Sequence, residues 1–374
     1  MSKIKVYVFF LVSTIICFFC YYFYRKRGKK NLIIGYIYRY PWFRVKNYFI
    51  SLIKVGFKNV DVVMFIEDVP QDTIEILKSI GVILYPMSER PDLSNNCLRW
   101  ELYANFLKEN KDKYNMVLHT DVRDTIFQKD VFQFYNSKNP FFGVSEEDIT
   151  LDEKINKNWI LTLCNESEYN NYFANRKVLC AGLVIGTPDK FIEYNNSIMK
   201  MAHGKSNGDQ RYLNYLVYHD NLFNDCIIIK NNSNSHLMHI GKTNREKIIL
   251  DNNDNILNFN GEIASVFHQY NRHKDIIEKM NQKFNDEDLN KTIYKKSQRD
   301  KNILSKKEIN KFCFIFLIIF IIIFLIIIYM IIKLKNYILK QKNKLQKVKI
   351  VYNLKSYKRR KFNSYKRIKQ YNNI

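Results

Sequence analysis

Residues 116–127 read MVLHTDVRDTIF, an apolar run typical of a buried strand that ends in two carboxylates, Asp121 and Asp124. Three shorter apolar runs of the same type come before it, at residues 31–37, 61–66 and 82–85. Between the runs, apolar residues recur at helical spacing, and two of these helical segments end near Gly56 and Gly81. Strands that alternate with helices over short connections form a parallel sheet with right-handed crossovers. The chain is therefore predicted to be an α/β protein, and this run is its fourth strand.

The two carboxylates are predicted to lie at a ligand site, because ligands bind beyond the carboxyl ends of parallel strands. Oxygen ligands of this kind suit hard divalent ions such as Mg²⁺ and Mn²⁺, which also accept phosphate as a partner. A solvated turn, in which Asp121 caps the following segment, is the other interpretation of this motif taken alone. Neither GxGxxG nor GxxxxGK[ST] follows a predicted strand, which argues against dinucleotide and P-loop sites.

Two later stretches add to this pattern: CAGLVIG at residues 180–186 and NGDQRYLN at residues 207–214. The first is a predicted strand with an internal glycine, Gly182, and such a glycine often marks close approach of the backbone to a ligand. The second places Asp209 and Gln210 at the start of a predicted helix. Taken singly, each pattern is also found in ordinary structural elements.

A third stretch, VFHQYNRHK at residues 266–274, contains a histidine that follows a short predicted strand. Shortly after His268 come two bases, Arg272 and Lys274. An imidazole can complete an oxygen-rich Mn²⁺ site, and arginine or lysine can neutralise a departing diphosphate. A lone histidine at such a position is more often structural, so this prediction depends on the combination of motifs.

Taken in order along the chain, the motifs resemble those of nucleotide-diphospho-sugar glycosyltransferases with the GT-A fold, over about residues 31–275. The resemblance implies a GT-A-like, Rossmann-like mixed sheet that is mainly parallel and flanked by helices. It also implies that residues 121–124 correspond to the DxD motif of that family and residues 180–182 to its acceptor-side strand. The spacing here is Asp-x-x-Asp, a departure that favours Asp124 as the direct metal ligand and leaves ribose or sugar contact open for Asp121.

The same resemblance implies roles for individual residues. A metal ion, Mn²⁺ or Mg²⁺, would be held by Asp121, Asp124, His268 and the diphosphate of the donor. Asp209 and Gln210 would be catalytic, with Asp209 as the base if transfer inverts the anomeric centre; inverting and retaining transfer both stay open. The residues expected to contact the substrates are Arg99, Asp121, Cys180, Ala181, Gly182, Arg272 and Lys274.

The net charge of +24 is concentrated in two tails of the chain. Residues 1–30 hold seven Lys or Arg and residues 333–374 hold fifteen, with no acid in either tail. The intervening residues 31–332 carry 38 bases against 36 acids. Each tail adjoins a long apolar run, at residues 6–24 and 312–332, and about 20 helical residues cross a bilayer. We therefore expect two transmembrane helices, contact of the basic tail with anionic lipid, and no nucleic-acid partner.

These runs divide the chain into five expected parts: an N-terminal signal anchor with its basic flank (1–30), a GT-A-like domain (31–275), a polar helical stalk (276–311), a transmembrane helix (312–332) and a basic low-complexity tail (333–374). The positive-inside rule assigns the acid-free tail to the cytoplasm, which places the domain in the lumen of the endoplasmic reticulum or Golgi. A cleaved signal peptide is the other interpretation of the first run, but no small residues suited to cleavage stand at its end.

Three functions are compatible with these patterns. The first is a membrane-anchored, metal-dependent glycosyltransferase that acts on a glycan, protein or lipid acceptor. The second is a catalytically inactive relative that serves as a membrane scaffold or binding protein. The third is a metal-dependent nucleotide-sugar hydrolase, for which Glu146, Glu147 or Asp148 would activate water.

Overall fold

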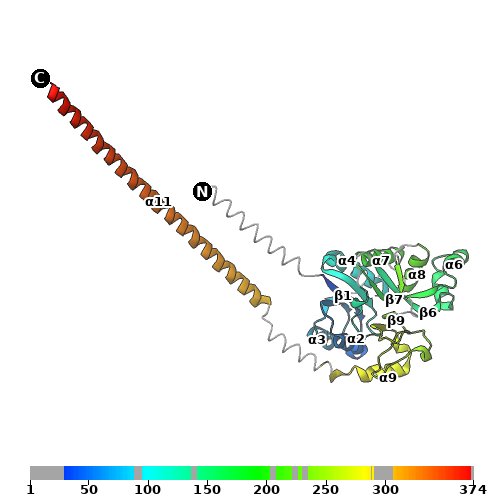
Figure 1. Ribbon diagram of the computed structural model, residues 1–374. Coiled ribbons are helices and arrows are strands. Elements are labelled where there is room, and N and C mark those ends of the chain that lie inside the picture. Colours follow the sequence, from blue (N-terminus) through cyan, green and yellow to red (C-terminus); the bar gives the residue numbers. More distant parts are fainter. Residues whose placement is uncertain are drawn as a thin grey trace. The chain divides into compact units, whose positions relative to one another are not determined.

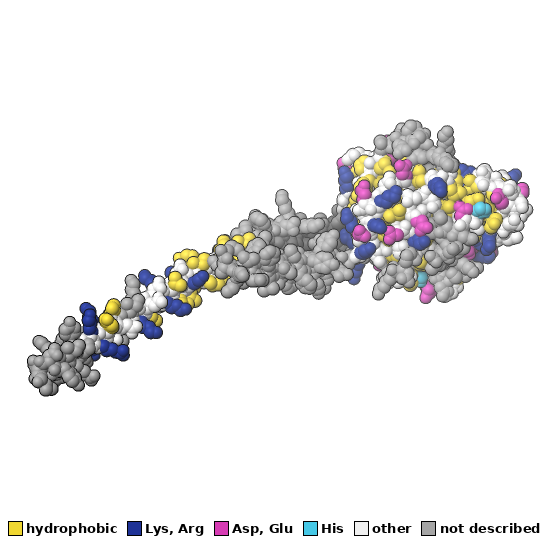
Figure 2. Space-filling view, turned by 90° about the horizontal axis from the view of Figure 1, so that it is seen from above, with side chains coloured by type: hydrophobic (Ala, Val, Ile, Leu, Met, Phe, Trp, Pro, Cys, Tyr) yellow, Lys and Arg dark blue, Asp and Glu magenta, His cyan; other side chains and the backbone are white. Residues whose placement is uncertain are grey.

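The computed structural model describes residues 29–87, 95–135, 141–202, 208–220, 226–229, 235–287, 289 and 306–371 (Figure 1). The chain forms two compact units, Met1–Tyr294 and Lys295–Ile374. In the second unit, the described residues form one helix, α11 (Lys306–Tyr371). Figure 2 shows acidic and basic side chains mixed on the visible face of the first unit, whereas the charged side chains described on α11 are all basic.

A mixed sheet forms the centre of the first unit, with seven described strands in the order β3-β2-β1-β4-β7-β6-β8. Their bounds are β1 (Lys30–Tyr38), β2 (Val60–Glu67), β3 (Ile83–Pro86), β4 (Tyr114–Thr120), β6 (Phe142–Thr150), β7 (Lys177–Gly186) and β8 (Cys226–Ile229). The pairs β1–β2, β1–β4, β2–β3 and β6–β8 are parallel, whereas β7 runs antiparallel to both β4 and β6. The predicted α/β class and the mixed, mainly parallel sheet are confirmed.

Helices flank this sheet (Figure 1). Their bounds are α2 (Trp42–Val55), α3 (Gln71–Ser79), α4 (Asn95–Asn110), α5 (Lys154–Ile160), α6 (Glu166–Tyr172), α7 (Pro188–Ala202), α8 (Asp209–Tyr218) and α9 (Lys274–Lys283). Helices α2 and α3 contribute Phe49 and Leu77 to one buried apolar cluster. Helices α4 and α7 contribute Trp100 and Tyr194 to a second cluster, which α8 also joins. Burial of these apolar side chains is the main force that holds the helices on the sheet.

The first half of the sheet follows the sequence pattern closely. All four strands predicted up to residue 119 are present as β1 to β4. Gly56 and Gly81 have φ angles of 65° and 87°, the left-handed conformation that ends a helix and that glycine adopts without strain. Strand β6, by contrast, was not predicted. It contains the acids Glu146 and Glu147, both buried, so its composition does not resemble that of a core strand.

A second, smaller sheet joins segments that are far apart in the sequence. It has three described strands, β5 (Thr125–Phe127), β10 (Val266–His268) and β9 (Leu237–His239), in that order. Strand β10 runs antiparallel to β5, with His268 opposite Thr125. It runs parallel to β9, with His268 opposite His239. This register places His268 next to the end of the Asp-x-x-Asp motif.

The two transmembrane helices stay predictions. No helix in the described part of the chain is long and apolar enough to cross a membrane. The first apolar run, residues 6–24, lies outside the described residues, and so do the side chains of residues 312–320, 322 and 323 in the second run. The backbone of the second run forms part of α11.

Asn214 on α8 bonds the backbone of β7 where the pairing of that strand with β6 is irregular. The register of the pair shifts between Val144 and Glu146, and Leu179 is the partner of Glu146. Asn214 accepts from the Leu179 N–H at 2.8 Å and donates to the Leu179 carbonyl at 2.9 Å. The Asn214 residue is only 1% exposed, so water cannot replace these bonds.

Asn214→Ala is therefore expected to lower the free energy of unfolding by about 2–4 kcal/mol, because it removes two buried hydrogen bonds to the backbone of β7. Urea unfolding followed by circular dichroism measures the change. Asn252→Ala, at an exposed turn, is the matched control and should shift the free energy by less than about 0.5 kcal/mol. Equal losses in the two variants would contradict this role for Asn214.

Candidate functional site

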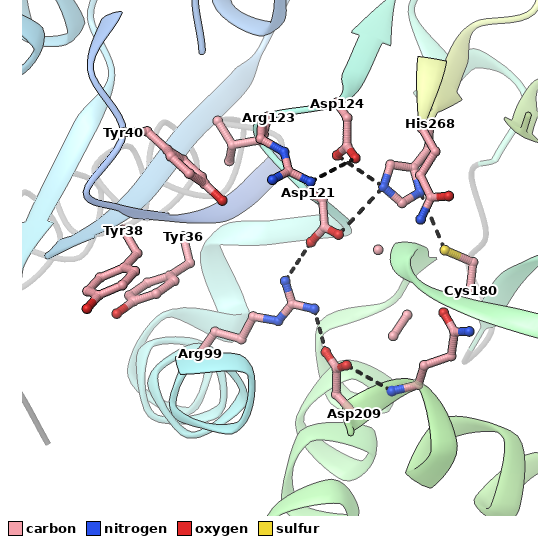
Figure 3. A pocket seen from close by; sticks show the side chains of 15 residues that line it. Tyr36, Tyr38, Tyr40, Arg99, Asp121, Arg123, Asp124, Cys180, Asp209 and His268 are labelled. Atoms are coloured by element: carbon pink, nitrogen blue, oxygen red, sulfur yellow. Dashed lines mark hydrogen bonds and ion pairs between the residues drawn. The ribbon is translucent and has the colours of Figure 1, made fainter. Parts of the chain in front are cut away.

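A cavity of about 360 Å³ lies at the carboxyl ends of β1 and β4, beside β7, β10 and the start of α8 (Figure 3). The predicted site residues that line it are Arg99, Asp121, Asp124, Cys180, Ala181, Gly182, Asp209, Gln210 and His268. Arg272 lines a neighbouring cavity instead. Lys274 is exposed at the start of α9 and lines neither cavity. The fold thus brings most of the predicted site together from distant segments.

Two carboxylates and an imidazole meet at one wall of this cavity (Figure 3). The Nε2 atom of His268 lies 3.3 Å from Asp124 Oδ1 and 3.5 Å from Asp121 Oδ2. The side chains of His268 and Asp124 are buried, whereas that of Asp121 is 35% exposed. Gln269 donates its backbone N–H to the Asp124 carbonyl at 2.7 Å, which extends the pairing of β5 and β10 to the motif itself.

The charges in this cluster stabilise one another. Burial alone would raise the pKa of Asp121, but Arg99 and His268 hold that pKa well below its usual value. Burial alone would lower the pKa of His268, but the carboxylates of Asp124 and Asp121 raise it well above its usual value. Burial raises the pKa of Cys180 to about 11, so the thiol is neutral at pH 7. The positive charge on the imidazole is therefore stabilised by Asp121 and Asp124.

Arg99 links this cluster to the start of α8. Its Nη1 donates to Asp121 Oδ1 at 2.6 Å, and its Nη2 donates to Asp209 Oδ2. Asp209 also accepts from the Trp100 indole at 3.2 Å and from the Gln210 N–H at 2.8 Å. Both oxygens of Asp209 are thus engaged, which does not favour its predicted role as a base. The guanidinium of Arg99, expected to reach the donor, instead joins two carboxylates of the protein.

Gly182 lets strand β7 pass close to the cluster. Its carbonyl accepts from the Asp121 N–H at 2.9 Å. A Cβ atom at this position would lie 2.5 Å from His268 Cε1 and 2.6 Å from Asp121 Oδ2, which is too close for any non-bonded contact. The backbone at Gly182 therefore lies close to these two side chains, and its close approach to a ligand stays a prediction.

Tyrosines on the cavity wall were missed by the sequence patterns. Tyr36 and Tyr38 lie two positions apart on β1, which places them on the same face of the strand, and Figure 3 shows their rings side by side. Tyr36 donates its hydroxyl to Glu67 at the end of β2. Tyr40 completes the set. The alternation of tyrosines from the end of the first predicted strand onward was the signal available in the sequence.

A second cavity, of about 350 Å³, adjoins the first, and Asp209, Gln210 and Gln269 line both. Its own lining includes the carboxyl of Glu147 and the indole of Trp159, which is 39% exposed. Burial raises the pKa of Glu147 to about 7, so this carboxyl carries a proton part of the time at neutral pH. Two cavities that share a wall can hold two substrates side by side.

The Asp-His cluster fits a divalent ion. Asp121, Asp124 and His268 each offer one ligand atom, and these atoms lie within 4.8 Å of one another. An octahedral shell with bonds of about 2.1 Å separates neighbouring ligands by about 3.0 Å. The distances of 3.3 and 3.5 Å from the imidazole nitrogen are close to that value. Two carboxylates with one imidazole suit Mn²⁺, which accepts both ligand types.

No family model and no curated protein matches the sequence. The structure is similar to glycosyltransferase GlyE of Streptococcus pneumoniae TIGR4, with 12% identity and a TM-score of 0.43 over 72% of this chain and 64% of GlyE. It is similar to the bifunctional glycosyltransferase WbbM, with 14% identity and a TM-score of 0.44 over 71% of this chain and 52% of WbbM. It is also similar to galactosyltransferase LgtC, solved with donor and acceptor sugar analogues, with 11% identity and a TM-score of 0.39 over 70% of this chain and 95% of LgtC. Likenesses at this level decide neither activity nor substrate.

Gly182→Ala is expected to keep the fold and to weaken Mn²⁺ binding by about tenfold or more, because the added methyl group would push His268 and Asp121 apart. Calorimetric titration with Mn²⁺ measures the affinity, and thermal unfolding checks the fold. Gly261→Ala is the matched control: nothing lies within 4 Å of an added Cβ there, so backbone strain is its only cost. Unchanged Mn²⁺ affinity in a folded Gly182→Ala variant would refute this account of the site.

Proposed function

We propose that the chain is a membrane-anchored, metal-dependent glycosyltransferase, which transfers a sugar from a nucleotide-diphospho-sugar to a glycan, protein or lipid acceptor. The observation that carries this proposal is the meeting of Asp121, Asp124 and His268 at one wall of the cavity. Two carboxylates and an imidazole are a ligand set that binds Mn²⁺ and leaves coordination positions for a diphosphate.

A bound Mn²⁺ or Mg²⁺ would supply a Lewis acid for the diphosphate leaving group. Asp121, Asp124 and His268 would hold the ion from the protein side. Arg123 lines the cavity with its guanidinium 3.7 Å from Asp124 Oδ2, and would share the charge of the diphosphate. Arg272, from the second cavity, would add positive charge as the sequence pattern predicts.

The tyrosines would bind the nucleoside of the donor. Tyr36 and Tyr38 present neighbouring rings at the cavity wall, and aromatic rings stack on nucleobases of any identity. The hydrogen bond from Tyr36 to Glu67 fixes the first of these rings. Stacking of this kind is compatible with both UDP-sugars and GDP-sugars.

The second cavity would hold the acceptor. Trp159 offers an exposed indole, and Glu147 offers a polar group for hydroxyls, the combination that orients a small polar ligand. Asp209 and Gln210, on the shared wall, would then contact both substrates. Because Arg99 and two N–H donors engage the Asp209 carboxylate, we assign Asp209 a role in positioning rather than in proton transfer.

A nucleotide-sugar hydrolase is the second candidate function. Of the three acids considered for activating water, Glu147 faces a cavity that adjoins the cluster. Glu147 lies beside His239, however, and not beside Asp121 or Asp124. This position suits contact with an acceptor hydroxyl better than activation of a water bound to the metal. An inactive scaffold is less compatible with the buried charges of Arg99 and Asp209, because buried ion pairs seldom improve stability over apolar residues.

Asp124→Asn is expected to abolish Mn²⁺-dependent binding of UDP or GDP and to lower turnover on the order of a thousandfold, since it removes an anionic ligand but keeps the shape of the side chain. His268→Ala should have the same effect to a smaller degree. Calorimetry with each nucleotide, with and without Mn²⁺, measures binding. Asp112→Asn, exposed at the other end of β4, is the matched control. The proposed site is wrong if folded Asp124→Asn keeps the Mn²⁺ dependence of the wild type.

We also propose that the GT-A-like domain faces the lumen of the endoplasmic reticulum or Golgi, on the support of the charge distribution along the chain. In sealed microsomes, the domain should resist added protease and carry a glycan at Asn165, which is exposed. Asn165 and Asn195 each begin an Asn-x-Ser acceptor sequence for N-glycosylation. Asn165→Gln should reduce the shift in gel mobility that glycosidase treatment causes, whereas Asn195 is fully buried and should carry no glycan. Digestion of the domain in intact vesicles would contradict this orientation.

A further inference from the structure

A second group of metal-type ligands lies beside the first and shares His268 with it. Cys180 on β7, His239 on β9 and His268 on β10 each offer one ligand atom, and these atoms lie within 4.8 Å of one another. All three residues are buried, with exposures of 1% or less. Cys180 and His268 also line the first cavity, so an ion can reach the group from there.

Strand pairing assembles this group. His239 and His268 are partners in the pairing of β9 with β10, and their rings lie 4.9 Å apart. The Cys180 Sγ atom lies 3.4 Å from His268 Nδ1 (Figure 3). A tetrahedral zinc ion, with bonds of about 2.3 Å to sulfur and about 2.05 Å to nitrogen, separates such ligands by about 3.6 Å. The sulfur and nitrogen are therefore already near the spacing that zinc requires.

The two ligand groups differ in the metal they prefer. A thiolate with two imidazoles selects zinc, whereas carboxylates favour Mn²⁺ or Mg²⁺. The Glu147 carboxyl lies 3.6 Å from the Nε2 atom of His239. A carboxyl group next to a metal-binding histidine commonly orients its ring. Glu147 is thus placed to orient His239 in a zinc site.

We propose that Cys180, His239 and His268 form a zinc site that competes with the Asp121–Asp124 site for His268. When zinc binds, Cys180 releases its thiol proton and His268 releases its Nδ1 proton to solvent, so that a thiolate and neutral imidazoles coordinate the ion. Zinc binding would then withdraw one ligand from the carboxylate site. The competition rests on the proposed metal site of the glycosyltransferase, whereas zinc binding itself does not.

The competition follows from the two nitrogens of one imidazole ring. In His268, Nδ1 faces Cys180, and Nε2 faces the two carboxylates. With zinc on Nδ1, the Nε2 atom keeps its proton and donates it to a carboxylate. With Mn²⁺ on Nε2, the Nδ1 atom keeps its proton and donates it to the sulfur. A neutral imidazole has one nitrogen lone pair to offer, so the two ions exclude each other.

Cadmium titration of the full chain in detergent tests the zinc site, because a thiolate bound to Cd²⁺ gives an ultraviolet charge-transfer absorption. Cys180→Ser should remove one equivalent of this absorption, and Cys164→Ser, the matched control at the other described free cysteine, should leave it unchanged. His239→Gln retains every cysteine and should weaken Cd²⁺ binding by about tenfold or more. Circular dichroism checks that each variant is folded. Wild-type Cd²⁺ binding in folded His239→Gln or folded Cys180→Ser refutes the zinc site.

Electron paramagnetic resonance of free Mn²⁺ tests the competition. One equivalent of Zn²⁺ should raise the apparent dissociation constant for Mn²⁺ by about tenfold or more in the wild type. The increase should be clearly smaller in Cys180→Ser, where only direct competition of Zn²⁺ for the carboxylate site remains. Simultaneous tight binding of both ions by the wild type overturns the competition for His268. A wild type that binds no Mn²⁺ refutes the carboxylate site and the competition together, and the Cd²⁺ titration then judges the zinc site by itself.

Discussion

The pairing of β10 with β5 is the contact on which the site depends. It holds His268 beside Asp124, and the N–H of Gln269 bonds to the Asp124 carbonyl at the end of the pair. Backbone hydrogen bonds, rather than attraction between the side chains, therefore set the distance between carboxylate and imidazole. Apolar packing anchors the strand itself, because Val266 and Phe267 are fully buried in two different apolar clusters. Strand β10 has only three residues, yet it can position His268 beside the carboxylates because apolar clusters on both sides hold the strand in place.

Charge at the cavity is only partly balanced within the chain. Asp121, Asp124 and Asp209 carry three negative charges, against which stand the guanidinium groups of Arg99 and Arg123. Buried charges without partners are costly, so the cluster gains from any cation that it can bind. The raised pKa of His268 shows the proton acting as that cation. A divalent ion would take over this role from the proton and leave net positive charge for a diphosphate.

The periodicity of apolar residues made β1 to β4 and the helices between them predictable. In each of these elements, the apolar residues of one face or run are the residues that the fold buries. This periodicity could not reveal β6, in which buried Glu146 and Glu147 interrupt the apolar pattern, nor β5, which is only three residues long. The residues that could bind a metal or a substrate were recognisable in the sequence. Which of them lie together in the fold was not, because the strand register that brings His268 to Asp124 is set by pairing between distant segments. For the same reason, the engagement of Asp209 by Arg99 could not be derived from spacing.

The Asp-x-x-Asp spacing has a structural reason that bears on the choice of ligand. Val122, the first residue between the carboxylates, is 3% exposed and packs in the core, whereas Arg123 faces the cavity. A Cβ on Gly35 would come within 2.9 Å of Val122 Cγ2, so the lack of a side chain at Gly35 makes room for the valine. One intervening residue thus anchors the turn and the other faces the cavity. Both carboxylates stay within 3.5 Å of His268, so the extra residue separates neither of them from the imidazole, and the spacing alone does not exclude Asp121 as a metal ligand.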